Sequence, residues 1–127
     1  MKEDTRAGKP SERFRAGRAG EDEAVAWLEQ AGLAIIARNF RSRIGEVDII
    51  AREGETIVFV EVKRWSAFGA EALDQGIDGR KQRRIIETAK YFLAAHREYN
   101  SMAVRFDVIF INHGALSHIP SAFGEFL

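Results

Sequence analysis

Two short segments of this chain combine the composition of β-strands with charged residues. They are residues 45–50 (Gly-Glu-Val-Asp-Ile-Ile) and residues 57–63 (Ile-Val-Phe-Val-Glu-Val-Lys). Both are rich in Val, Ile and Phe and are too short to form independent helices, which indicates strands. An ionised carboxylate inside an apolar layer is costly unless it is paired or binds a metal. Asp48 and Glu61, with Lys63 beside them, therefore suggest a divalent-metal site with an adjacent cation, as in a phosphodiesterase.

The alternation of side chains along a strand tests whether these groups can meet. Glu61 and Lys63 share one face of their strand with Phe59. We predict a two-residue turn at residues 53–54, which places Asp48 opposite Phe59 and diagonally adjacent to Glu61, within reach of a shared ion. A three-residue loop would turn Asp48 to the other face. The metal-site hypothesis therefore requires an even-numbered loop or a compensating bulge.

Length and composition describe a single globular domain. The chain has 127 residues, of which 46% are hydrophobic and 30% are charged. It contains no cysteine, which excludes disulfides, thiolate zinc sites and a cysteine nucleophile. No apolar run approaches the roughly 20 residues of a membrane span, and the first residues lack the apolar stretch of a signal peptide. We therefore expect a cytoplasmic protein without a membrane partner.

The pattern of apolar residues predicts an α/β fold. Residues 1–16 read as a mobile polar arm, and residues 17–127 as one domain. We predict helices at residues 21–31 and 80–97, with Gly32 as a left-handed cap, and a loop at residues 66–79. Besides the two motif strands, we predict strands at residues 33–40 and 104–111, and an edge strand at residues 116–119 that Pro120 ends. Residues 121–126 then form a tail or a single helical turn.

The order of these elements implies a mixed sheet. Three consecutive strands form a meander, and the long helix then crosses over to residues 104–111, which permits a parallel pair. The predicted fold class is α/β, with a mixed central sheet flanked by helices.

Basic residues flank the acidic centre in three clusters. One lies in the first twenty residues, one precedes the first motif strand, and one opens the long helix. Each cluster alone is equally well explained as solvated surface. Together they suit a site that holds a phosphate backbone. The candidates for contact with nucleic acid are Arg41, Arg43, Lys81, Arg83 and Arg84.

The motif segments resemble those of the bacterial YraN family. Residues 45–48 followed by residues 58–63 carry the resemblance, which extends over about residues 17–123. That family is usually placed in the PD-(D/E)xK nuclease superfamily, beside archaeal Holliday-junction resolvases. Residues 17–21 (Gly-Arg-Ala-Gly-Glu) resemble the start of the first resolvase helix, where a glutamate completes the acidic site. Residues 105–108 and 118–123 also resemble the YraN pattern, and Val47 stands where the superfamily's name has Pro.

The resemblance implies a restriction-endonuclease-like core and a DNA endonuclease that depends on Mg²⁺ or Mn²⁺. Asp48 would be the central metal ligand, and Glu61 the second ligand, helped by the backbone carbonyl of Val62. Lys63 would stabilise charge on the phosphate or orient the attacking water, and Glu21 would complete the acidic shell. Kinship with resolvases implies branched DNA as the first substrate to test, and a two-fold homodimer.

Each assignment has a structural alternative. Glu21 is also favoured by the helix dipole in a first turn, and Lys63 could extend its ammonium into solvent from the end of a strand. Asp48 and Glu61 could instead form an ion pair with Lys63 or Arg43. Glu46 shares a face with Asp48 and is either an extra ligand or the partner of a basic neighbour.

Two alternatives remain for the whole protein. The first is a module that binds nucleic acid or another partner with the same fold and does no chemistry. The second is a structural subunit of a larger complex.

Elsewhere in the chain, Asp107 is a further charged residue in a strand, and pairing with Arg105 is its simplest explanation.

Overall fold

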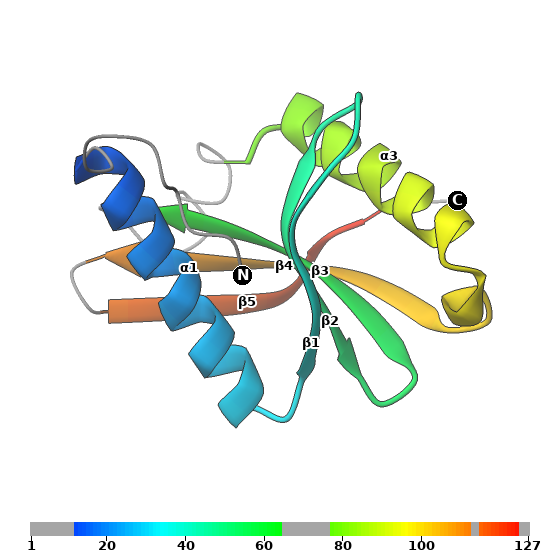
Figure 1. Cartoon of the computed structure of the whole chain (residues 1–127), viewed down its shortest axis with the longest axis horizontal. Coiled ribbons are helices and arrows are strands. Elements are labelled where there is room, and N and C mark those ends of the chain that lie inside the picture. Colours follow the sequence, from blue (N-terminus) through cyan, green and yellow to red (C-terminus); the bar gives the residue numbers. More distant parts are fainter. Residues whose placement is uncertain (1–11, 65–76, 113–114, 125–127) are drawn as a thin grey trace, which may run out of the picture.

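The computed structural model describes residues 12–64, 77–112 and 115–124. In these ranges five strands form one sheet in the order β1-β2-β3-β4-β5 (Figure 1). Strands β3 and β4 run parallel, and the other neighbours run antiparallel. The predicted α/β class with a mixed sheet is therefore confirmed. The elements are α1 (Glu12–Gln30), β1 (Ala34–Arg41), β2 (Glu46–Glu53), β3 (Thr56–Arg64), α3 (Gly79–Ala95), the 3-10 helix η1 (Arg97–Tyr99), β4 (Ala103–Asn112) and β5 (Ala115–Phe123).

Two apolar clusters flank the sheet, one under each helix. The cluster beneath α3 joins Phe92 of the helix to Phe59 and Phe110 of the sheet, all 2% exposed or less. The other cluster joins Leu28 of α1 to sheet residues that include Val60. Because both faces are covered, the central strands are continuously apolar, so each charge in them stands out. Among the described residues, no helix is long and apolar enough to cross a membrane.

Local signals at the helix ends fix where the helices stop and start. Gly32 has a φ of +97°, and the Leu33 amide donates to the Leu28 carbonyl at 2.9 Å, which confirms the predicted left-handed cap. Helix α3 begins after Asp78, whose carboxylate accepts a hydrogen bond from the Lys81 amide at 2.9 Å. This cap holds the first turn of α3 in place, and that turn forms part of the candidate site.

The turn between β2 and β3 lies one residue later than predicted. Glu53 pairs with Thr56, so the loop is residues 54–55 rather than residues 53–54. Gly54 has a φ of +59°, which a tight hairpin turn requires. The loop keeps an even number of residues, so each side chain keeps its predicted face while the register shifts by two. The ladder ends at Ile49 and Val60, and Asp48 and Glu61 are the next residues beyond that pair.

Two other boundaries differ from the prediction. Helix α1 begins at Glu12, so residues 12–16, predicted as part of a polar arm, are helical in backbone. Residues 1–11 lie outside the described residues, and so do residue 65 and residues 66–76 of the predicted loop. Strand β5 runs through Pro120 to Phe123, so the predicted end of this strand and the tail at residues 121–123 are wrong. Proline is tolerated because β5 is an edge strand, and the β4–β5 register shifts beside it.

A buried polar network ties α1 to the far edge of the sheet. Asp107 is fully buried and accepts hydrogen bonds from Arg105 Nε at 3.0 Å and from the Ser121 amide at 2.9 Å. The predicted pairing with Arg105 is therefore confirmed. His118 Nε2 lies 2.8 Å from Asp107, and its Nδ1 accepts from Trp27 Nε1 at 3.1 Å. Although burial acts to raise the pKa of Asp107, its bonds to His118, Arg105 and Ser121 hold that pKa below the usual value.

Candidate active site

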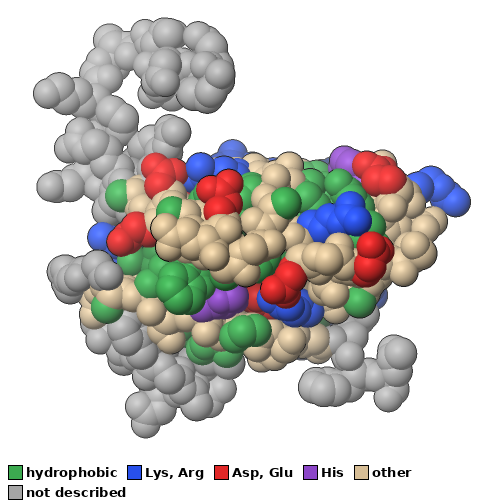
Figure 2. Space-filling model, turned by 90° about the horizontal axis from the view of Figure 1, so that it is seen from below, with side chains coloured by type: hydrophobic (Ala, Val, Ile, Leu, Met, Phe, Trp, Pro, Cys, Tyr) green, Lys and Arg blue, Asp and Glu red, His purple; other side chains and the backbone are tan. Residues whose placement is uncertain are grey.

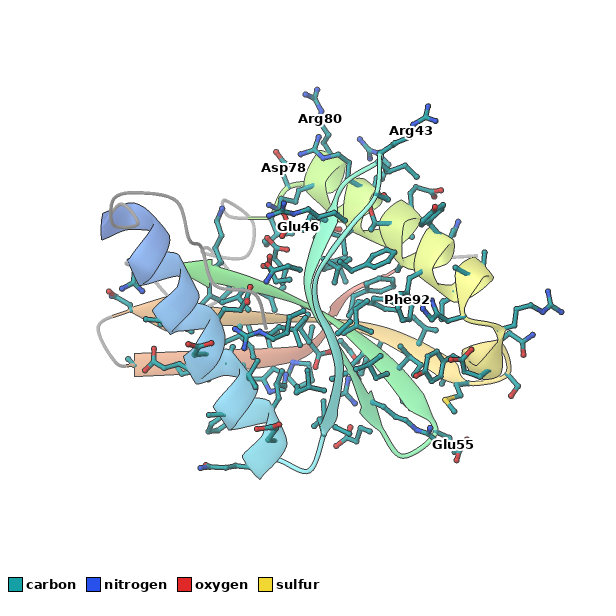
Figure 3. The ribbon with its side chains drawn as sticks, viewed as in Figure 1. Arg43, Glu46, Glu55, Asp78, Arg80 and Phe92 are labelled. Atoms are coloured by element: carbon teal, nitrogen blue, oxygen red, sulfur yellow. The ribbon has the colours of Figure 1, made fainter. Side chains whose placement is uncertain are left out.

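Asp48 and Glu61 line one small cavity of about 100 Å³. The start of β2, the C-terminal half of β3 and the first two turns of α3 form its wall. The other lining residues are Gly45, Glu46, Lys81, Arg84 and Ile85. Figure 3 shows Glu46 at this end of the molecule, near Asp78 at the start of α3. The two carboxylates that stood out in the apolar strands are thus brought to a single site.

The loop before β2 brings this wall close to α3. The Ser42 hydroxyl accepts hydrogen bonds from the amides of Ile44 and Gly45, at 3.1 and 3.3 Å. Gly45 lies directly against the helix, since a Cβ atom there would stand 3.2 Å from Thr88 Oγ1. This contact is tighter than usual, so a side chain at this position would require its neighbours on α3 to shift by a few tenths of an ångström. Glycine permits the close approach without that shift.

The ionised form of Asp48 is disfavoured by its surroundings. Burial raises the pKa of Asp48 to about 8, with a further contribution from the negative charge of Glu61. A hydrogen bond from the Val62 amide to Asp48 Oδ2, 2.8 Å long, acts in the opposite direction. A cation bound beside Asp48 would relieve this excess of negative charge. Val62 thus contacts Asp48 through its N–H, and the metal-binding role of its carbonyl stays a prediction.

Glu61 is paired with a lysine from another element. Its side chain is 7% exposed, and its Oε2 lies 3.0 Å from Lys81 Nζ. The sequence predicted Lys81 only as a phosphate contact, because nothing in the local pattern places the start of α3 against the end of β3. Lys63 faces the same side of β3 as Glu61, but it is not among the described residues that line the cavity.

The remaining acidic candidates lie close to this pair. Glu21 of α1 is held by Arg38 Nη2 at 2.8 Å and by Asn39 Nδ2 at 3.0 Å. It is not among the described residues that line the cavity, yet its charge helps to raise the pKa of Asp48. Glu46 lines the cavity and lies 3.5 Å from Arg41 Nε, so both of its predicted roles remain open. The clamp that Arg38 and Asn39 form on Glu21 was not predicted from the sequence.

Asp48 and Glu61 fit a metal ion whose remaining ligands would be water and substrate phosphate. Among the described residues, no three His, Cys, Asp or Glu side chains are grouped closely enough to hold a metal. Mg²⁺ is commonly held by one or two carboxylates, with water and substrate phosphate completing its coordination. Asp48 and Glu61 supply such a pair, and the Lys81 ammonium already marks a position where Glu61 accepts a cation. The residues fit Mg²⁺ or Mn²⁺ in that mode, but not a cage built from protein ligands alone.

Exposed arginines occur in the two segments that border the cavity on either side, the loop before β2 with the end of β1, and the start of α3. Arg41 and Arg43 come from the end of β1 and the loop after it, and Arg83 and Arg84 come from the start of α3. Figure 3 shows Arg43 and Arg80 projecting outward at the same end of the molecule. The face in Figure 2, by contrast, carries acidic and basic side chains interspersed. Of the predicted contacts with nucleic acid, Lys81 and Arg84 line the cavity, and Arg41 Nε lies 3.5 Å from Glu46, which also lines it. The cluster in the first twenty residues lies largely outside the residues whose side chains the structure describes.

A solved structure of a resolvase is among those that resemble this chain. The Holliday junction resolvase Hjc of Archaeoglobus fulgidus, from an archaeal hyperthermophile, aligns with a TM-score of 0.48 and 20% sequence identity. The alignment covers 83% of this chain and 77% of that chain.

Sequence comparisons identify the family. The model described as "Uncharacterised protein family UPF0102" matches residues 20–111. A UPF0102 protein of Treponema pallidum (strain Nichols) is 46% identical over 116 residues, which cover 86% of this chain and 92% of the relative. A UPF0102 protein of Persephonella marina is 45% identical over 107 residues, which cover 84% of this chain and 91% of the relative. The predicted family resemblance is confirmed, and this chain belongs to the UPF0102 family.

Proposed function

We propose that this protein is a metal-dependent DNA endonuclease whose active site is the cavity lined by Asp48 and Glu61. One observation carries the proposal: two largely buried carboxylates share a cavity with Lys81 and Arg84, at the end of the molecule where exposed arginines gather. A purely structural site would not need an uncompensated carboxylate whose pKa is raised to about 8. Strongly perturbed groups in a cavity are typical of functional sites.

The side chains divide between metal binding and phosphate binding. Asp48 and Glu61 would hold one Mg²⁺ or Mn²⁺, with Glu21 and Glu46 able to add to the acidic shell through water. When bound, that ion would lower the pKa of an attacking water and offset charge on the scissile phosphate. Lys63, next to Glu61 on the same face of β3, would orient the water or stabilise the developing charge.

The outer arginines would hold the DNA backbone. Arg43 and Arg83 are exposed, and they come from the loop after β1 and from the start of α3, two segments that also supply lining residues of the cavity. Contacts of this kind bind phosphate without reading base sequence, so we expect recognition by DNA shape rather than by sequence. The sequence resemblance to archaeal resolvases makes branched DNA the first substrate to test. A two-fold homodimer would place two such cavities to cut symmetric strands.

The proposal is tested by cleavage of a labelled four-way junction, with duplex and single-stranded DNA as controls, in Mg²⁺ and then in Mn²⁺. Wild type is expected to cut, and Asp48→Asn and Lys63→Ala are expected to lose at least about a hundredfold in rate, because each removes charge from the reacting centre. Variants prepared identically exclude a contaminating nuclease. If wild type and both variants fail to cut but bind the junction equally well, the proposal of catalysis is wrong.

One contact favours the alternative of a binding module without catalysis. Glu61 already has a full counter-charge in Lys81 at 3.0 Å, and such a pair would also suit a site that no longer holds metal. This alternative predicts binding of DNA or another partner that depends on the arginines and is indifferent to Mn²⁺. A structural subunit would show neither affinity for DNA nor affinity for metal.

A further inference from the structure

Lys81 reaches into the candidate active site from a fixed backbone. Its amide donates to the capping carboxylate of Asp78 at 2.9 Å, so its position at the start of α3 is set by the helix cap. Its side chain is only 36% exposed and lines the cavity, whereas Arg83 in the same turn is exposed. The ammonium therefore belongs to the interior of the site rather than to the outer basic surface.

The ion pair with Lys81 occupies the carboxylate of Glu61, which a bound metal would need as a ligand. Lys81 Nζ lies 3.0 Å from Glu61 Oε2, and the Glu61 side chain is 7% exposed. A carboxylate buried to this degree requires a positive partner when it is ionised. The cavity, at about 100 Å³, is small. Because the Lys81 ammonium is a compact point charge, it competes directly with any cation for Glu61.

We infer that Lys81 is the internal counter-ion of this site, which lowers its affinity for divalent metal until DNA is bound. In the DNA-free protein, Lys81 neutralises Glu61. When a phosphate enters the cavity, Lys81 turns from Glu61 to the phosphate, and Glu61 becomes free to bind metal. This inference rests on the proposed function, and it gives Lys81 a role as counter-ion in addition to the phosphate contact.

Two effects of opposite sign would distinguish this role from a merely structural one. Removing the ammonium should strengthen metal binding in the absence of DNA, because Glu61 loses its competitor. The same change should weaken cleavage at saturating metal, because the phosphate loses a cation. If Lys81 were merely structural, its removal would weaken both metal binding and cleavage, through misfolding.

The experiment is a calorimetric titration of DNA-free protein with Mn²⁺, followed by junction cleavage at saturating Mn²⁺. We compare wild type, Lys81→Met, Lys81→Gln and Asp48→Asn, with Lys90→Met as the matched control on an exposed part of α3. Both Lys81 variants are expected to bind Mn²⁺ about tenfold more tightly than wild type, within the usual range of coupling between sites. Their cleavage rates are expected to fall about a hundredfold, and Lys90→Met should match wild type in both measurements.

The outcomes separate this inference from the proposed function. Mn²⁺ binding that Asp48→Asn abolishes, but that both Lys81 variants leave unchanged or weaken, would overturn the role of Lys81 and leave the nuclease proposal standing. Absence of Asp48-dependent binding in wild type and in both Lys81 variants would overturn both. If Lys81→Met is unfolded by circular dichroism, Lys81→Gln decides, because its amide can still donate a hydrogen bond to Glu61.

Discussion

Replacing Asp48 with Asn is expected to stabilise the metal-free protein at pH 8, although it removes a central residue of the candidate site. Burial and the charge of Glu61 raise the pKa of Asp48 from 3.8 to about 8 in the folded state. Between these values the folded protein binds a proton that the unfolded chain has lost, so stability falls as the pH rises. Asparagine keeps an oxygen that can accept from the Val62 amide and carries no charge. We expect a gain of about 2–4 kcal/mol in the free energy of unfolding at pH 8.

Urea unfolding in EDTA at several values between pH 4 and pH 9 measures this effect. The curves of wild type and Asp48→Asn should converge near pH 4 and separate progressively up to pH 8. Glu55→Gln, a change in the exposed hairpin turn, is the control and should follow wild type. Added Mn²⁺ should stabilise wild type but not Asp48→Asn, because only the native carboxylate binds it. Equal stability of wild type and Asp48→Asn at pH 8 would contradict this account of the site.

The second large effect is expected at Asp107, on the other side of the sheet. Its carboxylate is fully buried and joins Arg105, His118 and the Ser121 amide. Replacement with Asn would leave the Arg105 guanidinium with less counter-charge, and it would present an amide N–H₂ where donors already converge. We expect Asp107→Asn to lower the free energy of unfolding by about 3–5 kcal/mol at pH 7, as when a buried pair loses one partner.

The effect of pH on stability at Asp107 has the opposite sign to its effect at Asp48. Because the folded pKa of Asp107 lies below 3.8, its contribution is present above about pH 4 and is lost as the pH falls through the folded value. Chemical unfolding at pH 7 and pH 3 should therefore show a smaller difference between wild type and Asp107→Asn in acid. Asp22→Asn, on the exposed face of α1, is the matched control. A loss below about 1 kcal/mol at pH 7 would mean that the network contributes little.

The acidic centre could be predicted because charges in apolar strands have few explanations. Asp48 and Glu61 stood out for that reason, and the even-numbered loop kept them on a common side. The register was wrong by two residues because Gly54, not Glu53, opens the turn, and sequence alone gives both residues a place in a tight loop. The assignment of side chains to the two faces of the sheet survives such an error, since a register shift of two residues preserves the face of every side chain.

Contacts between distant elements could not be predicted. The pairing of Lys81 with Glu61 depends on where α3 begins relative to the end of β3, and the apolar period of α3 fixes its buried face but not its axial position. The bond from the Ser121 amide to Asp107 was hidden for a related reason. It forms because β5 continues through Pro120 with a shift in register, whereas proline in a strand pattern indicates a boundary.

The central claim is that Asp48 and Glu61 together hold the catalytic metal. Its most direct test is a crystal of the wild-type protein bound to DNA and soaked in Mn²⁺, with the ion located by its anomalous scattering. We predict a peak within about 2.0–2.6 Å of a carboxylate oxygen from both Asp48 and Glu61, the range for hard cations and oxygen ligands. A protein that cleaves DNA with Mn²⁺, yet shows its Mn²⁺ peak away from these two carboxylates, would contradict the claim and place the active site elsewhere.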